Sequence, residues 1–406
     1  MSDSRRRHVF LLPWPLAGVG GVNGVVRNLA REFSESGPLR PLVVETHGEP
    51  AGRESPAPNQ EVETFRMTLL SPYDERHPLR ALISFCVRAP FLLFSLRAFC
   101  LDRRVDVLNP HFVGVDHFCL VLLKRLGLFS GRVLLSFHGS DIRHMIQSKG
   151  IERWFSRLTV RWADYLVPCS EGLRDEVLLF APECSRRILP VQNGIDVDLF
   201  LRLSAAEFEF PAPFAARPRL LNIGAFEYKK AHDVLLRAFS LLRQSHPLAA
   251  LVVAGQSRSL FEATQRLVSE LKLDADVLLY RDLPYERAAS LIGCCDLFVL
   301  SSRWEMGRYG EGLAMVLLEA AAAGKPVVTT LSCGVAELIE DGETGWIVPP
   351  EDPGSLAAAI KEALDHPQEA ARRASNLHQL VRRKFTWKKA HERYLELAET
   401  GESRRQ

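Results

Sequence analysis

Two glutamates, Glu311 and Glu319, bracket an apolar run that contains Gly312, Leu313, Ala314, Met315 and Val316 and is followed by Gly324-Lys-Pro-Val-Val. The run predicts a helix over Met315–Ala323, and the Gly and Pro that follow predict its end and the start of a strand. If the chain were helical from Gly312, the two carboxylates would lie about 12 Å apart along the axis. That is the size of a sugar joined to a nucleotide. The amides at the front of such a helix can bind a phosphate. An ordinary helix with two surface acids is the alternative.

A pair of lysines lies in a loop between a predicted strand and a predicted helix. The loop follows a predicted strand, Arg219–Ile223, begins at Gly224, ends at Lys229-Lys230 and leads into a predicted helix, Asp233–Gln244. A lysine between a strand and a helix can reach a phosphate held near that helix N-terminus. A solvated pair of lysines is the alternative interpretation.

The first half of the chain has a glycine-rich loop after the predicted strand His8–Leu12. Gly20 and Gly21 allow backbone amides to approach an anion or a substrate closely. Asn23 stands where the third glycine of a Gly-x-Gly-x-x-Gly sequence would be, so dinucleotide binding is only weakly indicated. A plain turn is equally compatible with this loop taken alone.

A histidine follows the predicted strand that starts at Val133, in the sequence Ser136-Phe-His138-Gly-Ser-Asp141. A histidine at the carboxyl end of a strand can bind a hydroxyl or assist with charge at a reacting carbon. A histidine with a purely structural role is the alternative.

No strong metal motif is present. Asp274-Ala-Asp276 has the spacing of a cation site but is only three residues long, and we interpret it as chance. The eight cysteines form no Cys-x-x-Cys pair, and there is no His-Glu-x-x-His sequence. We therefore predict activity without a metal, and reduced cysteines in a cytosolic setting.

Taken in order, these segments resemble the motifs of retaining glycosyltransferases of the family 4 type (glycosyl transferases group 1), which have the GT-B fold. The Glu311–Glu319 spacing resembles the family's E-x7-E motif, and Asn193-Gly-Ile-Asp196 resembles its N-G-I/V-D turn. Gly334-Val-Ala-Glu337 and Asp341-Gly-Glu-Thr-Gly345 resemble its G-G-x-x-E…D-G-x-x-G segment. The resemblance extends from Gly20 to about Ile360. It departs from the pattern at Ala225, where the family has an arginine, and at Ala231 and Cys333, where it has glycines.

The resemblance implies transfer of a sugar from a UDP- or GDP-sugar, with retention of configuration and no cofactor. It implies that Glu311, Lys230 and His138 act at the reacting sugar and diphosphate, and that Glu319 binds the ribose. The residues implied to line the donor site are Gly20, Gly21, Gly224, Lys230, Gly312, Leu313, Ala314, Met315, Val316 and Glu319. Lys229 or Arg303 are candidates to replace the missing arginine. A nucleotide-sugar epimerase and a non-catalytic binding subunit remain alternatives.

The composition predicts a soluble globular protein with two domains. The chain has 406 residues, 47% of them hydrophobic and 25% charged, and its net charge of +2 argues against a nucleic-acid partner. Short apolar runs alternate with helical patterns, which predicts an α/β fold of two Rossmann-like, doubly wound domains. One of the expected strands covers Ile188–Val191. We place the first domain at residues 1–203, a linker at 204–217, the second domain at 218–383 and a final helix returning to the first domain at 384–406.

The acceptor is harder to predict. Ala81–Leu101 is the most hydrophobic stretch, but Arg88, Pro90 and Arg97 interrupt it, so we do not expect it to span a membrane. Apolar and basic residues together can lie on an anionic membrane, which would suit a lipid-linked or glycan acceptor at the cytoplasmic face. A core helix with solvated arginines is equally compatible. The short apolar run after Arg7 does not resemble a signal peptide.

Overall fold

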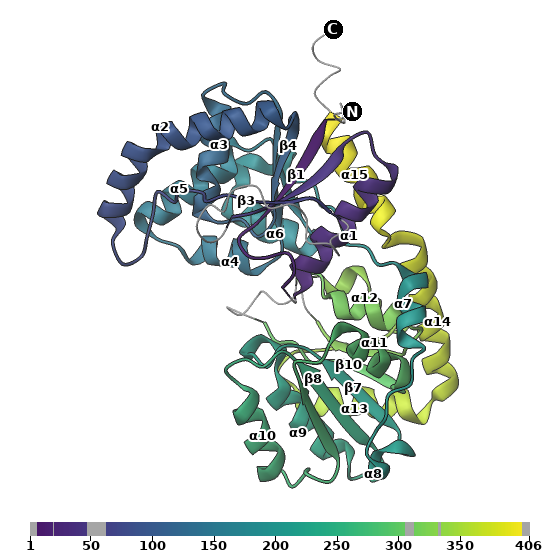
Figure 1. Cartoon of the computed structure of the whole chain (residues 1–406). Helices are drawn as coiled ribbons and strands as arrows, with labels where there is room; N and C mark the ends of the chain where they lie inside the picture. Colours follow the sequence, from purple (N-terminus) through teal and green to yellow (C-terminus); the bar gives the residue numbers. More distant parts are fainter. Residues whose placement is uncertain (1–5, 19, 47–61, 305–311, 332–333, 400–406) are drawn as a thin grey trace. The chain divides into compact units, whose positions relative to one another are not determined.

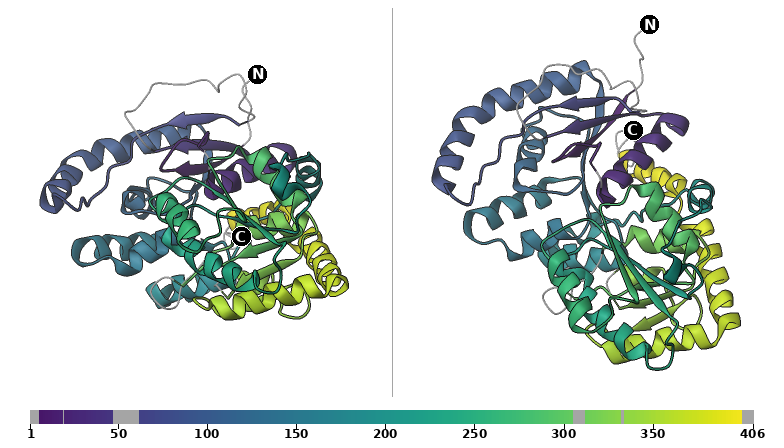
Figure 2. Two further views of the ribbon diagram at one scale, coloured as in Figure 1. Left: turned by 90° about the horizontal axis from the view of Figure 1, so that it is seen from below. Right: turned by 60° about the horizontal axis from the view of Figure 1, so that its bottom comes forward.

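The computed structural model describes residues 6–18, 20–46, 62–304, 312–331 and 334–399 (Figure 1). The chain divides into two compact units. The first comprises Met1–Asn193 together with Trp387–Gln406, and the second comprises Gly194–Thr386. Each unit has a parallel six-stranded sheet lying between helices (Figure 2). The predicted fold class, two Rossmann-like α/β domains, is confirmed.

The sheet of the first unit has the strand order β3-β2-β1-β4-β5-β6. Its strands are β1 (Arg7–Leu12), β2 (Arg40–Glu45), β3 (Thr64–Arg66), β4 (Val105–Pro110), β5 (Arg132–Phe137) and β6 (Tyr165–Pro168). The helices of this unit are α1 (Gly21–Ser36), α2 (Pro78–Asp102), α3 (Phe118–Arg125), α4 (Ser140–Gln147), α5 (Gly150–Trp162), α6 (Glu171–Phe180) and α15 (Trp387–Glu399). The central strands are buried along nearly their whole length, as expected of a parallel sheet covered on both faces.

The last helix, α15, groups with the first unit. It packs against α1, where the ring of His391 lies 4.3 Å from that of Phe33. The hydroxyl of Tyr394 lies 2.8 Å from Ser136 Oγ at the end of β5. The segment expected to form one final helix is divided at Phe385 and Thr386, between α14 and α15.

The sheet of the second unit has the order β12-β11-β10-β7-β8-β9. Its strands are β7 (Arg219–Ile223), β8 (Ala250–Gly255), β9 (Val277–Arg281), β10 (Leu297–Leu300), β11 (Val327–Thr330) and β12 (Trp346–Val348). Its helices are α7 (Val197–Ser204), α8 (Ala212–Ala215), α9 (His232–Leu242), α10 (Phe261–Glu270), α11 (Tyr285–Cys294), α12 (Met315–Ala322), α13 (Pro353–Asp365) and α14 (Pro367–Lys384). Helix α7 packs against α11 and α12. Gly194–Ser204 therefore belongs to the second unit by its contacts, and this unit begins before the linker predicted at 204–217.

Some elements differ from the expectations. The strand predicted at Ile188–Val191 is wrong, since only an isolated bridge joins Ile188 to Leu166. The strands β3 and β12 are three residues long, too short to stand out as apolar runs, and neither was predicted.

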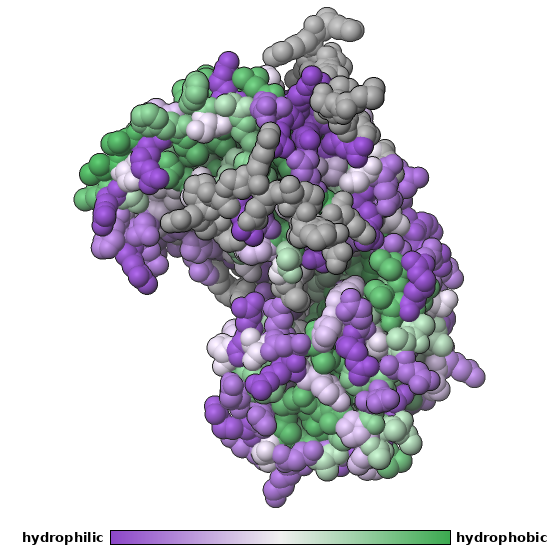
Figure 3. All heavy atoms as spheres, in the orientation of Figure 1, coloured by the Kyte–Doolittle hydropathy of each residue, from purple (hydrophilic) through white to green (hydrophobic). Residues whose placement is uncertain are grey.

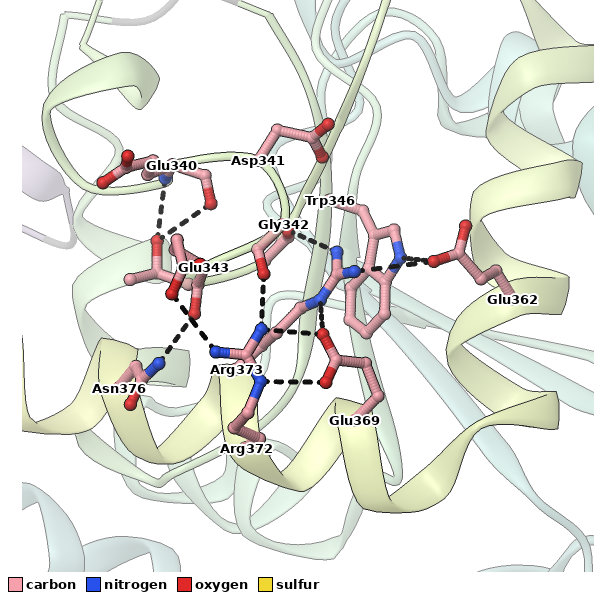
Figure 4. Close-up of polar contacts among 12 residues, drawn as sticks. Glu340, Asp341, Gly342, Glu343, Trp346, Glu362, Glu369, Arg372, Arg373 and Asn376 are labelled. Carbon is pink, nitrogen blue, oxygen red and sulfur yellow. Dashed lines mark hydrogen bonds and ion pairs between the residues drawn. The ribbon is translucent and has the colours of Figure 1, made fainter.

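Arginines of α14 anchor the turn that carries the Asp341-Gly342 motif (Figure 4). Buried Arg373 donates from Nε to Glu369 at 2.8 Å and from Nη1 to Gly345 O at 3.0 Å. Its guanidinium also lies 4.0 Å from the centre of the Trp346 ring. Its neighbour Arg372 makes its bonds at the surface, to Glu369, Glu343 and Gly342 O. The motif is therefore a structural turn held against a helix.

Replacing Arg373 by alanine should lower the free energy of unfolding by about 2–3 kcal/mol, since the buried carbonyl of Gly345 loses a charged donor. The matched control is Arg372→Ala, which removes the same charge one residue away at the surface and should have a much smaller effect. Urea denaturation of the three proteins measures both changes. Equal losses would show that burial does not distinguish the two arginines.

Candidate active site

The second sheet brings several predicted residues to the carboxyl ends of its strands. The loop after β7 carries Gly224 and Lys230, the segment after β10 carries Arg303, and α12 follows on the same connection. In a parallel sheet these ends share one edge, which is where ligands bind in open α/β folds. Glu311 lies outside the described residues, so its place in this group stays a prediction.

The side chain of Lys230 runs across Gly224. A Cβ atom at Gly224 would lie 3.0 Å from Lys230 Cδ, so a residue without a side chain leaves room for the lysine stem. Ser301 Oγ donates to the backbone oxygen of Lys230 at 2.9 Å and thereby ties this loop to the end of β10. Ala231 has φ 50° and ψ 44°, the left-handed conformation that favours glycine. This geometry explains why the family has glycine there, and shows that this chain accommodates alanine.

Arg303, a candidate for the missing arginine, is engaged by two carboxylates. Its Nη2 donates to Asp233 at 2.8 and 2.9 Å, and its Nε lies 2.6 Å from Glu351. The guanidinium lies 4.1 Å from the centre of the Tyr228 ring. The other candidate, Lys229, pairs with Glu227 at 3.1 Å. The described contacts therefore assign both cations to partners within the protein.

Helix α12 begins at Met315, with Ala314 as its N-cap, and Gly312 and Leu313 form a bend before it. A Cβ at Gly334 would lie only 1.6 Å from Gly312 O. The glycine at 334 therefore lets the segment after β11 lie directly against the backbone at the front of α12.

Glu319 lies in the second turn of α12 and accepts a hydrogen bond from the hydroxyl of Tyr285 on α11 at 3.1 Å. Part of the Glu319 residue remains exposed to solvent. Burial of its carboxyl nevertheless raises the pKa of that group to about 7, and the hydrogen bond from Tyr285 opposes the rise. The group is thus balanced between its acid and its carboxylate near neutral pH. Tyr285 was not predicted from the sequence.

In the first unit, Asn23 organises the loop that holds Gly20 and Gly21. Its Nδ2 donates to Pro15 O at 2.8 Å and to Gly18 O at 2.9 Å, and its Oδ1 accepts from Trp14 Nε1. The asparagine that breaks the glycine pattern therefore closes the loop with its side chain.

The sequence His138-Gly-Ser-Asp141 is explained by the buried carboxylate of Asp141. This carboxylate accepts from the backbone N–H groups of His138, Gly139, Ile142 and Val113, at 2.9 to 3.2 Å. Burial nevertheless raises its pKa. The aspartate therefore shapes the loop that presents His138.

His138, itself half-buried, ends a line of buried polar side chains at the end of the first sheet. Its Nε2 lies 3.0 Å from His111 Nδ1, and His111 Nε2 lies 3.2 Å from Asn109 Oδ1. His8 Nε2 lies 3.2 Å from the same oxygen. Burial lowers the pKa of His138 to about 4 and that of His8 to about 3, and lowers the pKa of His111 well below its usual value. All three rings are therefore neutral at physiological pH.

The Asp-x-Asp sequence has a structural role. Asp276 accepts from Arg217 at 2.6 Å and pairs with Arg243 at 2.7 Å, while Asp274 accepts from Ser269 Oγ at 2.6 Å. Within the described ranges, no three His, Cys, Asp or Glu side chains gather as a metal site would require.

Comparison with known proteins now adds the family. Residues 19–199 match Glycosyltransferase Family 4, and residues 205–379 match Glycosyl transferases group 1. The chain belongs to these glycosyltransferases. The resemblance inferred from the motifs is confirmed.

Relatives of this glycosyltransferase include the glycogen synthase of Mycobacterium tuberculosis, 33% identical over 70% of this chain and 66% of that protein. The GDP-mannose-dependent alpha-(1-6)-phosphatidylinositol monomannoside mannosyltransferase of Mycolicibacterium smegmatis is 30% identical over 62% of this chain and 66% of that protein. The matched region thus spans slightly under two thirds of each relative.

Solved structures show that the fold extends over the whole chain. Anabaena HepE in complex with UDP and glucose superposes with a TM-score of 0.72 at 16% identity, covering 97% of this chain and 99% of HepE. Sucrose-phosphate synthase from Thermosynechococcus elongatus gives a TM-score of 0.74 at 20% identity, with 97% and 98% covered. These similarities establish the GT-B fold of this glycosyltransferase.

Replacing Tyr285 by phenylalanine should raise the pKa of Glu319 above about 7. The tyrosine O–H donates to the carboxyl and favours its ionised form, so its loss makes protonation easier and moves the titration to higher pH. Carbon-13 NMR of labelled glutamate carboxyls measures the change, with Glu319→Gln to assign the signal. Tyr280→Phe, on β9, the strand that precedes α11 in the chain, is the matched control and should leave the titration unchanged. A midpoint that stays the same or falls in Tyr285→Phe would contradict the assigned role.

Proposed function

We propose that this glycosyltransferase moves a sugar from a nucleotide-diphosphate donor to an acceptor hydroxyl, with retained configuration and without a metal. The observation that supports this best is the placement of Lys230 and the front of α12 on neighbouring loops at one edge of the second sheet. A cation and helix N-terminal amides there suit a leaving diphosphate, whose negative charge grows as the glycosidic bond breaks.

Glu319 suits the nucleoside part of the donor. As a carboxylate it accepts hydrogen bonds from the two hydroxyls of a ribose, and with a pKa of about 7 it is largely ionised just above neutral pH. Tyr285 keeps the carboxyl oriented from α11.

In the proposed reaction, Glu311 binds hydroxyls of the donor sugar and His138 lies near the reacting carbon, in accordance with the family resemblance. Since His138 is neutral, it can form hydrogen bonds to sugar hydroxyls without placing a fixed positive charge beside a developing oxocarbenium ion. The carboxylate of Asp141 keeps its loop in shape.

The relatives' names support a bacterial-type glycan or lipid-linked acceptor. One relative is GDP-mannose-dependent and is named for phosphatidylinositol monomannoside, and another, WcaL of Salmonella typhimurium, is named for colanic acid biosynthesis. Solved HepE structures contain UDP or UDP-glucose. We accordingly propose a UDP- or GDP-sugar donor and a polysaccharide or glycolipid acceptor used in the cytoplasm, at the inner membrane face.

A non-catalytic, nucleotide-sugar-binding subunit is a second candidate. It is motivated by Ala225, in the position of the family's arginine, together with the carboxylate partners of Arg303. Donor turnover distinguishes the two, because a binding subunit retains nucleotide sugar without consuming it.

Binding of UDP-, GDP-, ADP- and TDP-sugars, measured by calorimetry with EDTA present, should reveal one preferred donor. Glu319→Ala and Lys230→Ala should each weaken its binding by about 10- to 100-fold, the loss of a charged hydrogen bond. Lys229→Ala removes the adjacent charge and serves as the matched control, with an expected change below about threefold. Equal losses in the two lysine variants would contradict the assignment of Lys230, and binding that requires Mg²⁺ would contradict the metal-free proposal.

A further inference from the structure

Helix α2 exposes an apolar face along its whole length. The six large side chains on this face are each at least 65% exposed: Leu79, Ile83, Val87, Phe91, Phe94 and Leu101. Their spacing of mostly three or four residues places them on one side of a helix. The opposite side is buried in the first unit through Phe85, Ala89, Leu93, Leu96 and Cys100. In Figure 3 apolar surface gathers where Figure 1 shows α2. A continuous exposed patch of this kind marks an interaction surface.

The same helix carries positive charge and almost no negative charge. Arg80, Arg88 and Arg97 are all exposed, and no aspartate or glutamate occurs between Pro78 and Leu101. Long arginine side chains beside an apolar face can extend to the phosphates of lipids while the apolar residues enter the acyl region. The charge of α2 is therefore complementary to an anionic membrane.

A second copy of the chain is a poorer partner for this face. A two-fold dimer brings the same surface together from both copies, so six arginines would meet without a carboxylate from α2 to pair with them. An anionic lipid surface provides the missing negative charge.

The packing of α2 also determines how it would meet a membrane. With 25 residues it is long and apolar enough to cross a bilayer, the one such helix in the described part of the chain. Its inner side, however, packs against α3 and β4. If α2 crossed the bilayer, those buried residues would leave the core. If α2 lies flat on the membrane, only the face that already points away from the core contacts the lipids.

We propose that α2 is a peripheral docking surface that lies flat on an anionic membrane. Arginines bind lipid phosphates, and Phe91 and Phe94 insert between the lipids. This surface is independent of the donor site, so the test needs no nucleotide sugar and its outcome does not depend on the proposed transfer reaction.

Co-flotation of the full chain with phosphatidylcholine vesicles, with and without phosphatidylglycerol, tests the proposal. The wild type should bind the anionic vesicles only. Replacing the three arginines by glutamine should weaken binding by roughly fivefold per arginine, and Phe91→Glu with Phe94→Glu should abolish it. Leu248→Glu, which replaces a residue 71% exposed on the second unit, is the matched control and should bind normally.

Circular dichroism should show that each variant is folded. Equal flotation with neutral vesicles, or with the double Phe variant, would overturn the proposal. So would a dimer that the Phe substitutions dissociate while no variant binds vesicles, because the face would then be a contact between copies.

An independent observation, the line of buried polar groups ending at His138, assigns a tautomer. Asn109 Nδ2 donates to Leu134 O at 3.0 Å, and a carbonyl can only accept, so Asn109 Oδ1 must face the histidines. His111 Nε2 therefore carries the proton that this oxygen accepts, which leaves Nδ1 of the neutral ring as an acceptor. His138 Nε2 must then donate to His111 Nδ1, and His138 Nδ1 is left as an acceptor nitrogen.

We infer that Asn109 and His111 are positioning residues that hold His138 in the Nε2–H tautomer. The suggested use of this tautomer rests on the proposed function, because an acceptor nitrogen suits a sugar hydroxyl. The evidence for the tautomer itself is the hydrogen-bond geometry and is independent of that function. Beside them Phe112 has φ 65°, a conformation that is rare for a bulky residue and that typically persists where surrounding structure enforces it.

Nitrogen-15 NMR of labelled histidine in the full chain tests this directly, with His138→Gln assigning the signal. The wild type should show His138 protonated at Nε2, and His111→Phe should release it to a mixture of tautomers. An Nδ1–H tautomer in the wild type, or an unchanged spectrum of His138 in a folded His111→Phe variant, would overturn the inference whether or not sugar transfer is found.

Discussion

Every strand in both sheets runs parallel to its neighbours, and this constraint determines where chemistry can occur. All strands of a unit end at one edge, so residues far apart in sequence meet there without any special contact between them. In the first unit, Asn109, His111 and His138 come from the ends of β4 and β5. In the second, Gly224, Lys230 and Arg303 come from the ends of β7 and β10, and α12 begins nearby. The helices serve this arrangement by covering the faces of the sheets, which is why the central strands are buried along nearly their whole length.

Burial then adjusts the charge of each group at these edges. In the first unit it removes charge from histidines, whose pKa values fall, so a neutral polar network remains. In the second unit it favours the protonated form of a carboxyl, and the pKa of Glu319 rises to about 7. The cations of the second unit keep their charge and are paired with carboxylates, since Arg303 contacts two of them and Lys229 contacts one. The first unit thus offers a neutral hydrogen-bonding network and the second a set of opposed charges, which suits the proposed roles of His138 at the sugar and of Lys230 at the diphosphate.

Much of this arrangement could be predicted from the sequence. The apolar runs identified ten of the twelve strands in the described residues, and the motifs placed Lys230, His138 and Glu319 at strand ends or on the helix that follows. Helix α14 is among the helices that were not predicted: it buries two alanines, Leu377, Val381 and the charged Arg373 among many charged residues, so its apolar stripe is weak. Tyr285, Asn109 and His111 could not be assigned, because their importance lies in partners from other strands and helices. The role of Glu311 stays a prediction, since that residue lies outside the described part of the chain.

The membership of α15 in the first unit has a consequence for how the protein is made. Tyr394 reaches Ser136, and His391 packs on Phe33, across more than two hundred residues of chain. A ribosome therefore completes the whole second unit before the first can close its core. Until then Phe33 and the end of β5 lack their final cover. The nascent first unit must remain incomplete, and exposed to chaperones or to misassembly, while its neighbour is synthesised.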